Sequence, residues 1–88
     1  MWMLSRVTGA SPLKALRSRR HRALCSVLAL ARKAAGLSQH DLALRLKTSQ
    51  TVIARIEIGE RRIDVIEFID LSRALKIDPR EVLTQLMR

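Results

Sequence analysis

The chain has 88 residues, 48% of them hydrophobic, with one Phe, one Trp and no Tyr. A chain of this length forms one domain, and a core of Leu, Ile, Val and Ala suits packed helices better than a sheet. The composition therefore predicts an all-α domain. It disfavours a β-sandwich, which would need more turn residues than two prolines and three glycines supply.

The charge is unevenly distributed along the chain. The formal net charge is +9, which predicts a polyanionic partner. Residues 1–40 hold eight basic residues and no acidic one, because Asp41 is the first carboxylate. Residues 41–88 hold nine basic and eight acidic residues, so the excess positive charge belongs to the first half of the chain.

The single cysteine, Cys25, rules out an internal disulfide and fits a reducing compartment. It lies on a helical apolar stripe with Leu24, Val27 and Leu28, which favours a small core residue over a reactive thiol. No apolar run approaches the ~20 residues of a membrane span, and polar residues interrupt any signal-peptide core. We therefore expect a cytoplasmic protein with no membrane partner, although the Arg- and Ser-rich start also resembles an organellar presequence.

Residues 1–18 are expected to form a basic N-terminal arm, followed by one domain over residues 19–88. The apolar residues 2–4 (Trp-Met-Leu) either dock on the domain or on a twin subunit, or form an unremarkable terminus. Ser11-Pro12 is typical of a helix start, so a short helix over residues 13–17 is one alternative for the end of the arm.

Five helices are expected after the arm, from apolar spacings of three and four residues and from capping residues. Gly36 is a predicted left-handed stop, and Gly59 is predicted to end the third helix. The pattern of Asp with Glu three residues later, at 64–67 and again at 78–81, is typical of a helix start. The expected helices span residues 19–35, 39–47, 50–58, 65–75 and 79–87, with Ser38 and Ser49 as caps of the second and third.

The same spacings predict which side chains face the core. The expected core residues are Ala23, Leu24, Val27, Leu28 and Ala31 in the first helix, Leu42, Ala43 and Leu46 in the second, and Val52, Ile53 and Ile56 in the third. In the last two helices they are Ile66, Ile69, Leu75 and either Leu71 or Phe68, then Val82, Leu83 and Leu86.

The segment 50–58 has two faces of different chemistry. At about 100° per residue, its aliphatic side chains fall on one side, and the other side carries Gln50, Thr51, Ala54 and Arg55. Gln and Arg can each make paired hydrogen bonds to base edges in the DNA major groove, Gln to adenine and Arg to guanine. This face therefore indicates sequence-specific binding of double-stranded DNA.

The residues from 36 to 59 also resemble a known family. Gly36-Leu37-Ser38-Gln39, Asp41-Leu42-Ala43, Ser49-Gln50, Ile53, Arg55-Ile56-Glu57 and Gly59 are similar to the motif of the lambda-repressor-like (Cro/XRE-type) helix-turn-helix domain. The resemblance covers about residues 21–86. It implies a five-helix fold whose second helix lies over the DNA backbone and whose third helix enters the major groove.

By position, the resemblance implies base contacts from the residues that the face calculation selects: Gln50, Thr51, Arg55 and, through a thymine methyl, Ala54. It also implies a pair between Arg32 and Glu57. Two interpretations of this ion pair are open. The pair is partly buried and holds the third helix against the first, or it is exposed to solvent and contributes little to stability.

Phosphate contacts are expected from several positions around the motif. The resemblance implies Gln39, and a helix N-terminus at Ser38 and Gln39 suits an anionic oxygen. Cations at the start of the first helix oppose its dipole, which favours phosphate binding over a merely solvated face. The full expected set is Ser38, Gln39, Lys47, Ser49, Arg61, Arg62, Arg19, Arg20 and Arg22.

Two residues depart from the family pattern. Lys47 stands where the turn between the second and third helices usually has glycine, and a left-handed conformation there would cost roughly 1–2 kcal/mol. Ile58 stands where a polar residue is usual. It packs on a partner subunit, packs on a sugar edge, or is simply exposed.

Catalysis and metal binding are not indicated, so we expect neither an enzyme nor a cofactor. His21 and His40 have no second ligand at metal-binding spacing, and Ser38, His40 and Asp41 on one turn cannot form a catalytic triad.

The sequence as a whole is interpreted as that of a bacterial or phage transcriptional repressor, associated with the nucleoid, that binds DNA as a homodimer. The dimer seam is expected at Val82, Leu86 or Met87, or in the arm. The alternative is an antitoxin or adaptor that holds a protein partner such as a toxin.

Overall fold

The computed structural model describes residues 18–88, and within this range the chain forms five α-helices and no strand. The expected all-α class is confirmed. The predicted arm lies outside the described residues except for Ser18, and so do the expected helix start at Ser11-Pro12, the alternative helix over residues 13–17 and the docking of residues 2–4. The helices are α3 (Arg19–Ala34), α4 (Gln39–Leu46), α5 (Gln50–Glu57), α6 (Val65–Leu75) and α7 (Pro79–Leu86).

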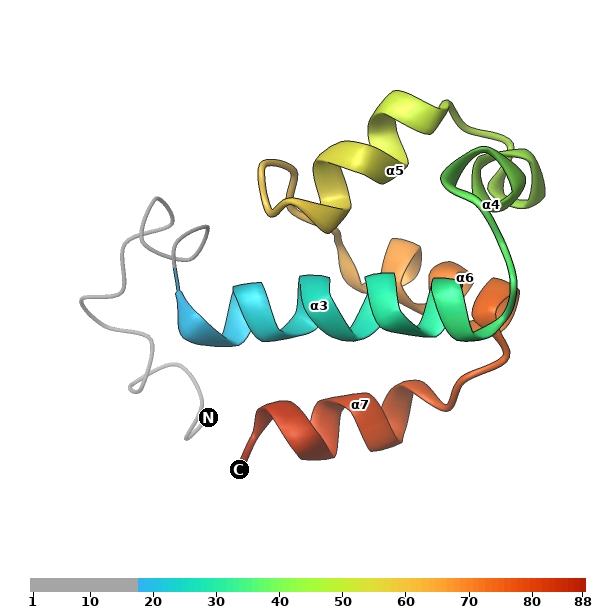
Figure 1. Ribbon diagram of the computed structural model, residues 1–88. Helices are drawn as coiled ribbons and strands as arrows, with labels where there is room; N and C mark the ends of the chain where they lie inside the picture. Colours follow the sequence, from blue (N-terminus) through green and yellow to red (C-terminus); the bar gives the residue numbers. More distant parts are fainter. Residues whose placement is uncertain (1–17) are drawn as a thin grey trace.

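The longest helix, α3, runs through the middle of the domain (Figure 1). It packs against α5 on one side and against α7 on the other, and α7 runs in the opposite direction to α3. The fourth element of the bundle, α6, lies behind α3 and contacts α3, α4 and α7. This arrangement leaves α4 and α5 together at one side of the molecule and α7 at the opposite side.

Side-chain caps define where each helix begins. Ser18, Ser38 and Ser49 accept hydrogen bonds from the backbone N–H groups of His21, Asp41 and Val52. Asp64 forms a reciprocal capping box with Glu67 at the start of α6, and Ser38 forms another with Asp41 at the start of α4. Such caps satisfy amides that have no partner inside the helix, which is why the predicted starts are correct.

Left-handed residues follow the ends of four of the helices. Gly36 has a positive φ of 73°, as expected, and Gly59, which follows α5, has a positive φ of 84°. Lys47 and Lys76 adopt the same conformation, with φ of 55° and 58°. Lys47 therefore adopts the left-handed conformation for which the family usually has glycine, and the chain repeats this conformation at Lys76 after α6.

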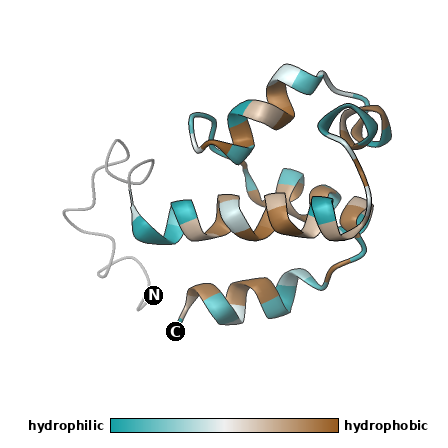
Figure 2. Cartoon of the chain, viewed as in Figure 1, coloured by the Kyte–Doolittle hydropathy of each residue, from teal (hydrophilic) through white to brown (hydrophobic). Residues whose placement is uncertain are grey.

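The buried core consists of aliphatic side chains from all five helices together with Phe68. In the cartoon coloured by hydropathy, each helix carries both hydrophobic and hydrophilic residues (Figure 2). Its members are Leu28, Leu42, Ala43, Ile53, Ile56, Phe68, Leu71, Leu75 and Val82. Cys25 is also buried, and burial raises the pKa of its thiol. The expectation of a small core cysteine is correct.

Three expected core positions are wrong. Ile66 is 67% exposed and Leu83 is 47% exposed, and Ala23 is exposed as well. One helix can bury one stripe only: α6 buries Phe68, with Leu71 and Leu75 on the same face, and α7 buries Val82. Because Val82 is only 5% exposed, it is also unsuitable for the dimer seam that the sequence suggested.

Within residues 18–88, no helix has both the length and the apolar composition needed to cross a bilayer.

Candidate nucleic-acid interface

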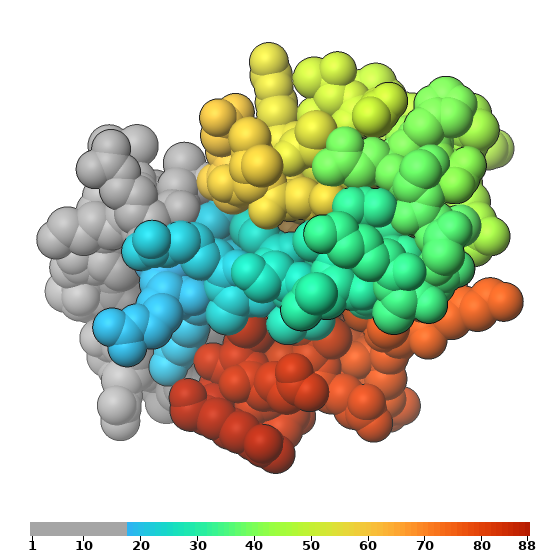
Figure 3. Space-filling view, in the orientation of Figure 1, coloured from blue at the N-terminus to red at the C-terminus, as the bar shows by residue number. Residues whose placement is uncertain are grey.

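The outward face of α5 carries polar side chains above a buried apolar face. Gln50, Thr51 and Arg55 are exposed and Ala54 is half-buried, whereas Ile53 on the opposite face is 2% exposed. In the space-filling view α5 forms the upper edge of the molecule, with neither α6 nor α7 above it (Figure 3). A flat ligand could therefore approach the polar face without displacing any described part of the chain.

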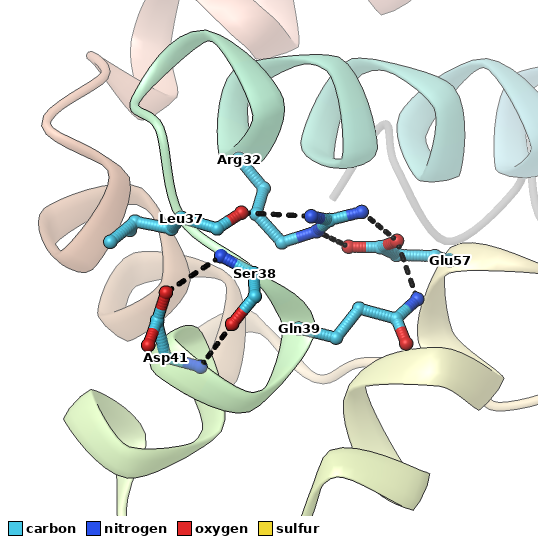
Figure 4. A network of polar contacts seen from close by, with 6 residues as sticks. All are labelled: Arg32, Leu37, Ser38, Gln39, Asp41 and Glu57. Atoms are coloured by element: carbon cyan, nitrogen blue, oxygen red, sulfur yellow. Dashed lines mark hydrogen bonds and ion pairs between the residues drawn. The ribbon is translucent and has the colours of Figure 1, made fainter.

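The C-terminal end of α5 is held by a polar network that joins three helices (Figure 4). Arg32 of α3 donates from Nε to Glu57 Oε2 at 2.6 Å and from Nη2 to Glu57 Oε1 at 3.0 Å. Gln39 of α4 donates from Nε2 to Glu57 Oε1 at 3.0 Å, and Arg32 Nη1 donates to the Leu37 carbonyl oxygen at 2.8 Å. The side chains of Arg32 and Glu57 are 10% and 9% exposed, so this is the buried alternative for the pair that the resemblance implied.

The electrostatics of the network keep Glu57 ionised. Burial acts to raise the pKa of the Glu57 carboxyl, but hydrogen bonds from Arg32 and Gln39 and the positive charges of Arg32 and Lys33 outweigh it, so the pKa lies below its ordinary value. The hydrogen bonds to Glu57 likewise raise the pKa of Arg32. Both groups are therefore charged at neutral pH, and the bidentate geometry sets the angle of α5 against α3.

The N-terminus of α4 lies beside this network, but it is less open to anions than the sequence suggested. The Ser38 amide donates to Asp41 Oδ2 at 2.9 Å, and this bond contributes most to lowering the pKa of the Asp41 carboxyl. The negative charge of Asp41 thus occupies the helix end, and the amides of Gln39 and His40 remain for a phosphate oxygen. The Gln39 side chain keeps one N–H and its carbonyl oxygen beyond its bond to Glu57.

The family is established by comparison with known proteins. A helix-turn-helix family model matches residues 28–82, which is more than half of the chain. The chain belongs to the XRE-type helix-turn-helix family. The resemblance drawn from its residues is therefore confirmed, and at this coarse level the chain is a DNA-binding transcriptional regulator.

Two solved structures are similar to this XRE-type chain. One is an XRE-family like protein from Pseudomonas syringae pv. tomato str. DC3000, with 40% identity, a TM-score of 0.76, and coverage of 89% of this chain and 95% of that one. The other is the restriction-modification controller protein C.AhdI from Aeromonas hydrophila, with 32% identity, a TM-score of 0.63, and coverage of 67% and 86%. No protein of curated function matches the sequence.

The expected phosphate-binding residues of this XRE-type domain differ in their availability. Arg19, Arg20, Arg62, Lys47 and Ser49 are exposed. Arg22 is exposed as well, and its backbone amide donates to Ser18 in the first turn of α3.

Arg61 is the exception among these residues, because it pairs with Glu67. Arg61 Nη2 donates to Glu67 Oε2 at 2.8 Å and Nη1 donates to Oε1 at 3.3 Å. The hydrogen bond from Arg61 is the largest cause that lowers the pKa of the Glu67 carboxyl. Most of the charge of Arg61 is therefore offset within the protein, while that of Arg62 faces solvent.

Besides the hydrogen bonds from Arg32 and Gln39 to Glu57, a third contact holds the end of α5, and it was not predicted from the sequence. His21 Nε2 lies 3.3 Å from the carbonyl oxygen of Gly59, and an oxygen of this type can only accept, so the ring donates. In the sequence, His21 was considered only as a possible metal ligand, and no further ligand was found at suitable spacing. In the described part of the chain no three His, Cys, Asp or Glu residues gather into a metal site.

Proposed function

We propose that this protein is a transcriptional repressor that reads a specific DNA sequence in the major groove with α5 and binds as a homodimer. The observation that carries the proposal is the outward face of α5, where Gln50, Thr51 and Arg55 are exposed on a helix whose other face is buried. A helix fastened at its end by Arg32 and Glu57 presents these groups in a fixed orientation, which sequence reading requires.

Each exposed group on α5 has a base edge that suits it. The Gln50 amide can pair with N6 and N7 of adenine, and the Arg55 guanidinium can pair with O6 and N7 of guanine. The Thr51 hydroxyl can donate or accept, and the methyl group of Ala54 suits the C5-methyl of thymine. Each paired contact contributes about 1–3 kcal/mol of discrimination against the wrong base.

The proposed phosphate contacts flank α5 on both sides. They are the α4 N-terminus at Ser38 and Gln39, the turn residues Lys47 and Ser49, the loop residues Arg61 and Arg62, and the α3 start at Arg19, Arg20 and Arg22. Phosphate contacts position the protein but carry no sequence information. An eight-residue reading helix spans few base pairs, so two copies about one helical turn apart supply the affinity and specificity that one copy lacks.

Repression follows from occupancy, because a dimer that spans two successive major grooves blocks access to that stretch of DNA. The restriction-modification controller relative supports a role in regulating gene expression. An antitoxin or adaptor with the same fold would bind a toxin, and this binding would not require the groups on α5 that are proposed to read bases.

The test is selection of genomic fragments by the purified protein, followed by titration of the enriched site against a scrambled duplex. Gln50→Ala and Arg55→Ala should each lose about 1–3 kcal/mol of preference for the enriched site. The matched controls are Gln85→Ala and Arg88→Ala, which remove an exposed glutamine and an exposed arginine from the α7 side of the molecule. Equal affinity of the wild-type protein for enriched and scrambled duplexes would end the proposal.

A further inference from the structure

The outer face of α6 carries apolar and charged groups that no other described part of the chain covers. At about 100° per residue, Ile66, Asp70 and Arg73 lie opposite the buried stripe of α6, and all three are exposed. Ile66 is 67% exposed and its neighbour Val65 is 71% exposed. Val65 lies about 100° from Ile66 around the helix, so it is on the flank of this face and Ile66 is the apolar residue at its centre.

A shallow recess adjoins this face on the side of α5. It has a volume of about 100 Å³, an apolar lining that includes Val52 and Leu71, and a rim that includes Glu67 and Asp70. Asp70 thus lies between the exposed Ile66 on one side and the recess on the other. Ile66 projects from this face and the recess adjoins it, and both are apolar. In a symmetric pair, Ile66 of each copy can therefore pack toward the recess of the other.

The position of α6 in the fold distinguishes this face from α7. In Figure 1, α5 lies above α3, α7 lies below it and α6 lies behind it. A pair of copies joined through the outward face of α7 would point their α5 helices in opposite directions. A pair joined through the outer face of α6 can keep both α5 helices on one side, as reading a single operator requires.

The charges along the outer face of α6 are self-complementary under a two-fold axis. If two α6 helices run antiparallel, Asp70 of each copy faces Arg73 of the other, because the two residues lie one turn apart on the same face. The surrounding segment from residue 60 to 73 holds four of the eight carboxylates of the chain and three arginines. With three positive and four negative residues, this segment does not share the large positive charge of the whole chain, which is +9.

We propose that a second copy of this chain docks antiparallel on the outer face of α6, with Ile66 buried and with Asp70 of each copy paired to Arg73 of the other. This inference rests on the proposed function, because a dimer that reads DNA sets the direction in which both α5 helices face. It replaces the seam on α7 that the sequence suggested.

The test is a charge exchange measured by sedimentation equilibrium on the full chain without DNA. Asp70→Lys places Lys opposite Arg73, and Arg73→Glu places Glu opposite Asp70, so each variant alone should weaken the dimer at least about tenfold. An equimolar mixture of the two variants should regain wild-type dimer affinity, because in the heterodimer both pairs are again opposite in sign. A merely structural role for either residue would give no such recovery.

Matched variants on α7 and a parallel DNA titration separate the possible failures. Ile66→Ser should weaken the dimer, while Met87→Ser, which changes a side chain that is 76% exposed on the rival face, should leave it unchanged. The proposed seam would be overturned by any of three results: a weaker dimer in Met87→Ser, a wild-type chain that is monomeric, or a mixture of the two charge variants that does not regain dimer affinity. If the charge exchange works but the dimer has no preferred DNA sequence, the proposed function fails while the seam stands.

Discussion

The Glu57 carboxylate accepts hydrogen bonds from two other helices, two from Arg32 on α3 and one from Gln39 on α4. These bonds connect the end of α5 to α3 and α4. Since the charged atoms are buried, each partner depends on the other to offset the cost of leaving water. The orientation of the exposed side chains of α5, which we propose read bases, therefore depends on residues that do not themselves face outward.

Removing one side of this pair should cost far more than removing both. Arg32→Met leaves the Glu57 charge buried and uncompensated, so we expect a loss of about 3–5 kcal/mol in the free energy of unfolding. The double variant Arg32→Met/Glu57→Met removes both charges and should be less destabilised than Arg32→Met alone. Urea unfolding of the three proteins measures both values. A loss below about 1 kcal/mol for Arg32→Met would mean that solvent screens the pair.

The lowered pKa of Glu57 predicts how this contribution depends on pH. A carboxyl whose folded pKa lies below its ordinary value of 4.5 stabilises the fold above that value, and the contribution disappears as pH falls through the folded pKa. The difference in unfolding free energy between wild type and Glu57→Gln should therefore be largest at neutral pH and shrink below pH 4.5. A difference that stays constant from neutral pH down to acid unfolding would contradict this prediction.

Two lysines in the same strained conformation provide a matched pair for testing phosphate contact. A left-handed conformation costs about 1–2 kcal/mol and glycine loses about 0.5–1 kcal/mol more backbone entropy. Lys47→Gly and Lys76→Gly should thus each raise the unfolding free energy by up to about 1 kcal/mol. Only Lys47 adjoins α5, so only Lys47→Gly should lower the salt slope of DNA binding, by about one. Equal slopes for both variants would remove Lys47 from the interface.

At the scale of the elements, local chemistry explains why the helix ends could be predicted. Ser38, Ser49 and Asp64 bond to amides three residues away, so the signal lies within one turn. The polar face of α5 was predictable for the same reason, because it depends only on helical spacing. Burial was less predictable: Ile66 and Phe68 are both apolar, and the packing of α6 on the rest of the domain decides which is covered.

Contacts between elements were the part that the sequence could not reveal. Arg61 and Arg62 are adjacent and chemically identical, yet only Arg61 reaches Glu67 across the loop. Gln39 and Glu57 meet only because α4 and α5 fold against each other. The pairing of Arg32 with Glu57 was available in advance through family resemblance, since periodicity alone contains no information on partners 25 residues apart.

The loop between α5 and α6 gives a direct comparison of paired and unpaired arginine. The charge of Arg61 is offset by Glu67, whereas Arg62 is exposed. Arg62→Ala should reduce the slope of log affinity against log salt by about one, and Arg61→Ala should change it by less. Fluorescence anisotropy titrations with the enriched duplex at several salt concentrations provide both slopes. A larger effect from Arg61→Ala would show that Arg61 leaves Glu67 for phosphate when DNA binds.

At the scale of the whole molecule, α5 and α7 lie on opposite sides of α3 (Figure 1). In the proposed arrangement, DNA lies on the α5 side and the second copy on the α6 side, so two separate surfaces serve two separate roles. If one copy reads few base pairs, as proposed, the spacing between two copies becomes part of the recognition.

That spacing can be changed in the DNA without altering the protein. Inserting about five base pairs between the half-sites of the enriched operator, which is half a helical turn, turns one half-site to the opposite side of the duplex. A dimer with both α5 helices on one side can then contact only one half-site, so affinity should fall to that of an isolated half-site. Inserting the same number outside the half-sites should have no effect. Undiminished affinity after the central insertion would mean that each copy binds independently, and the rigid dimer would have to be abandoned.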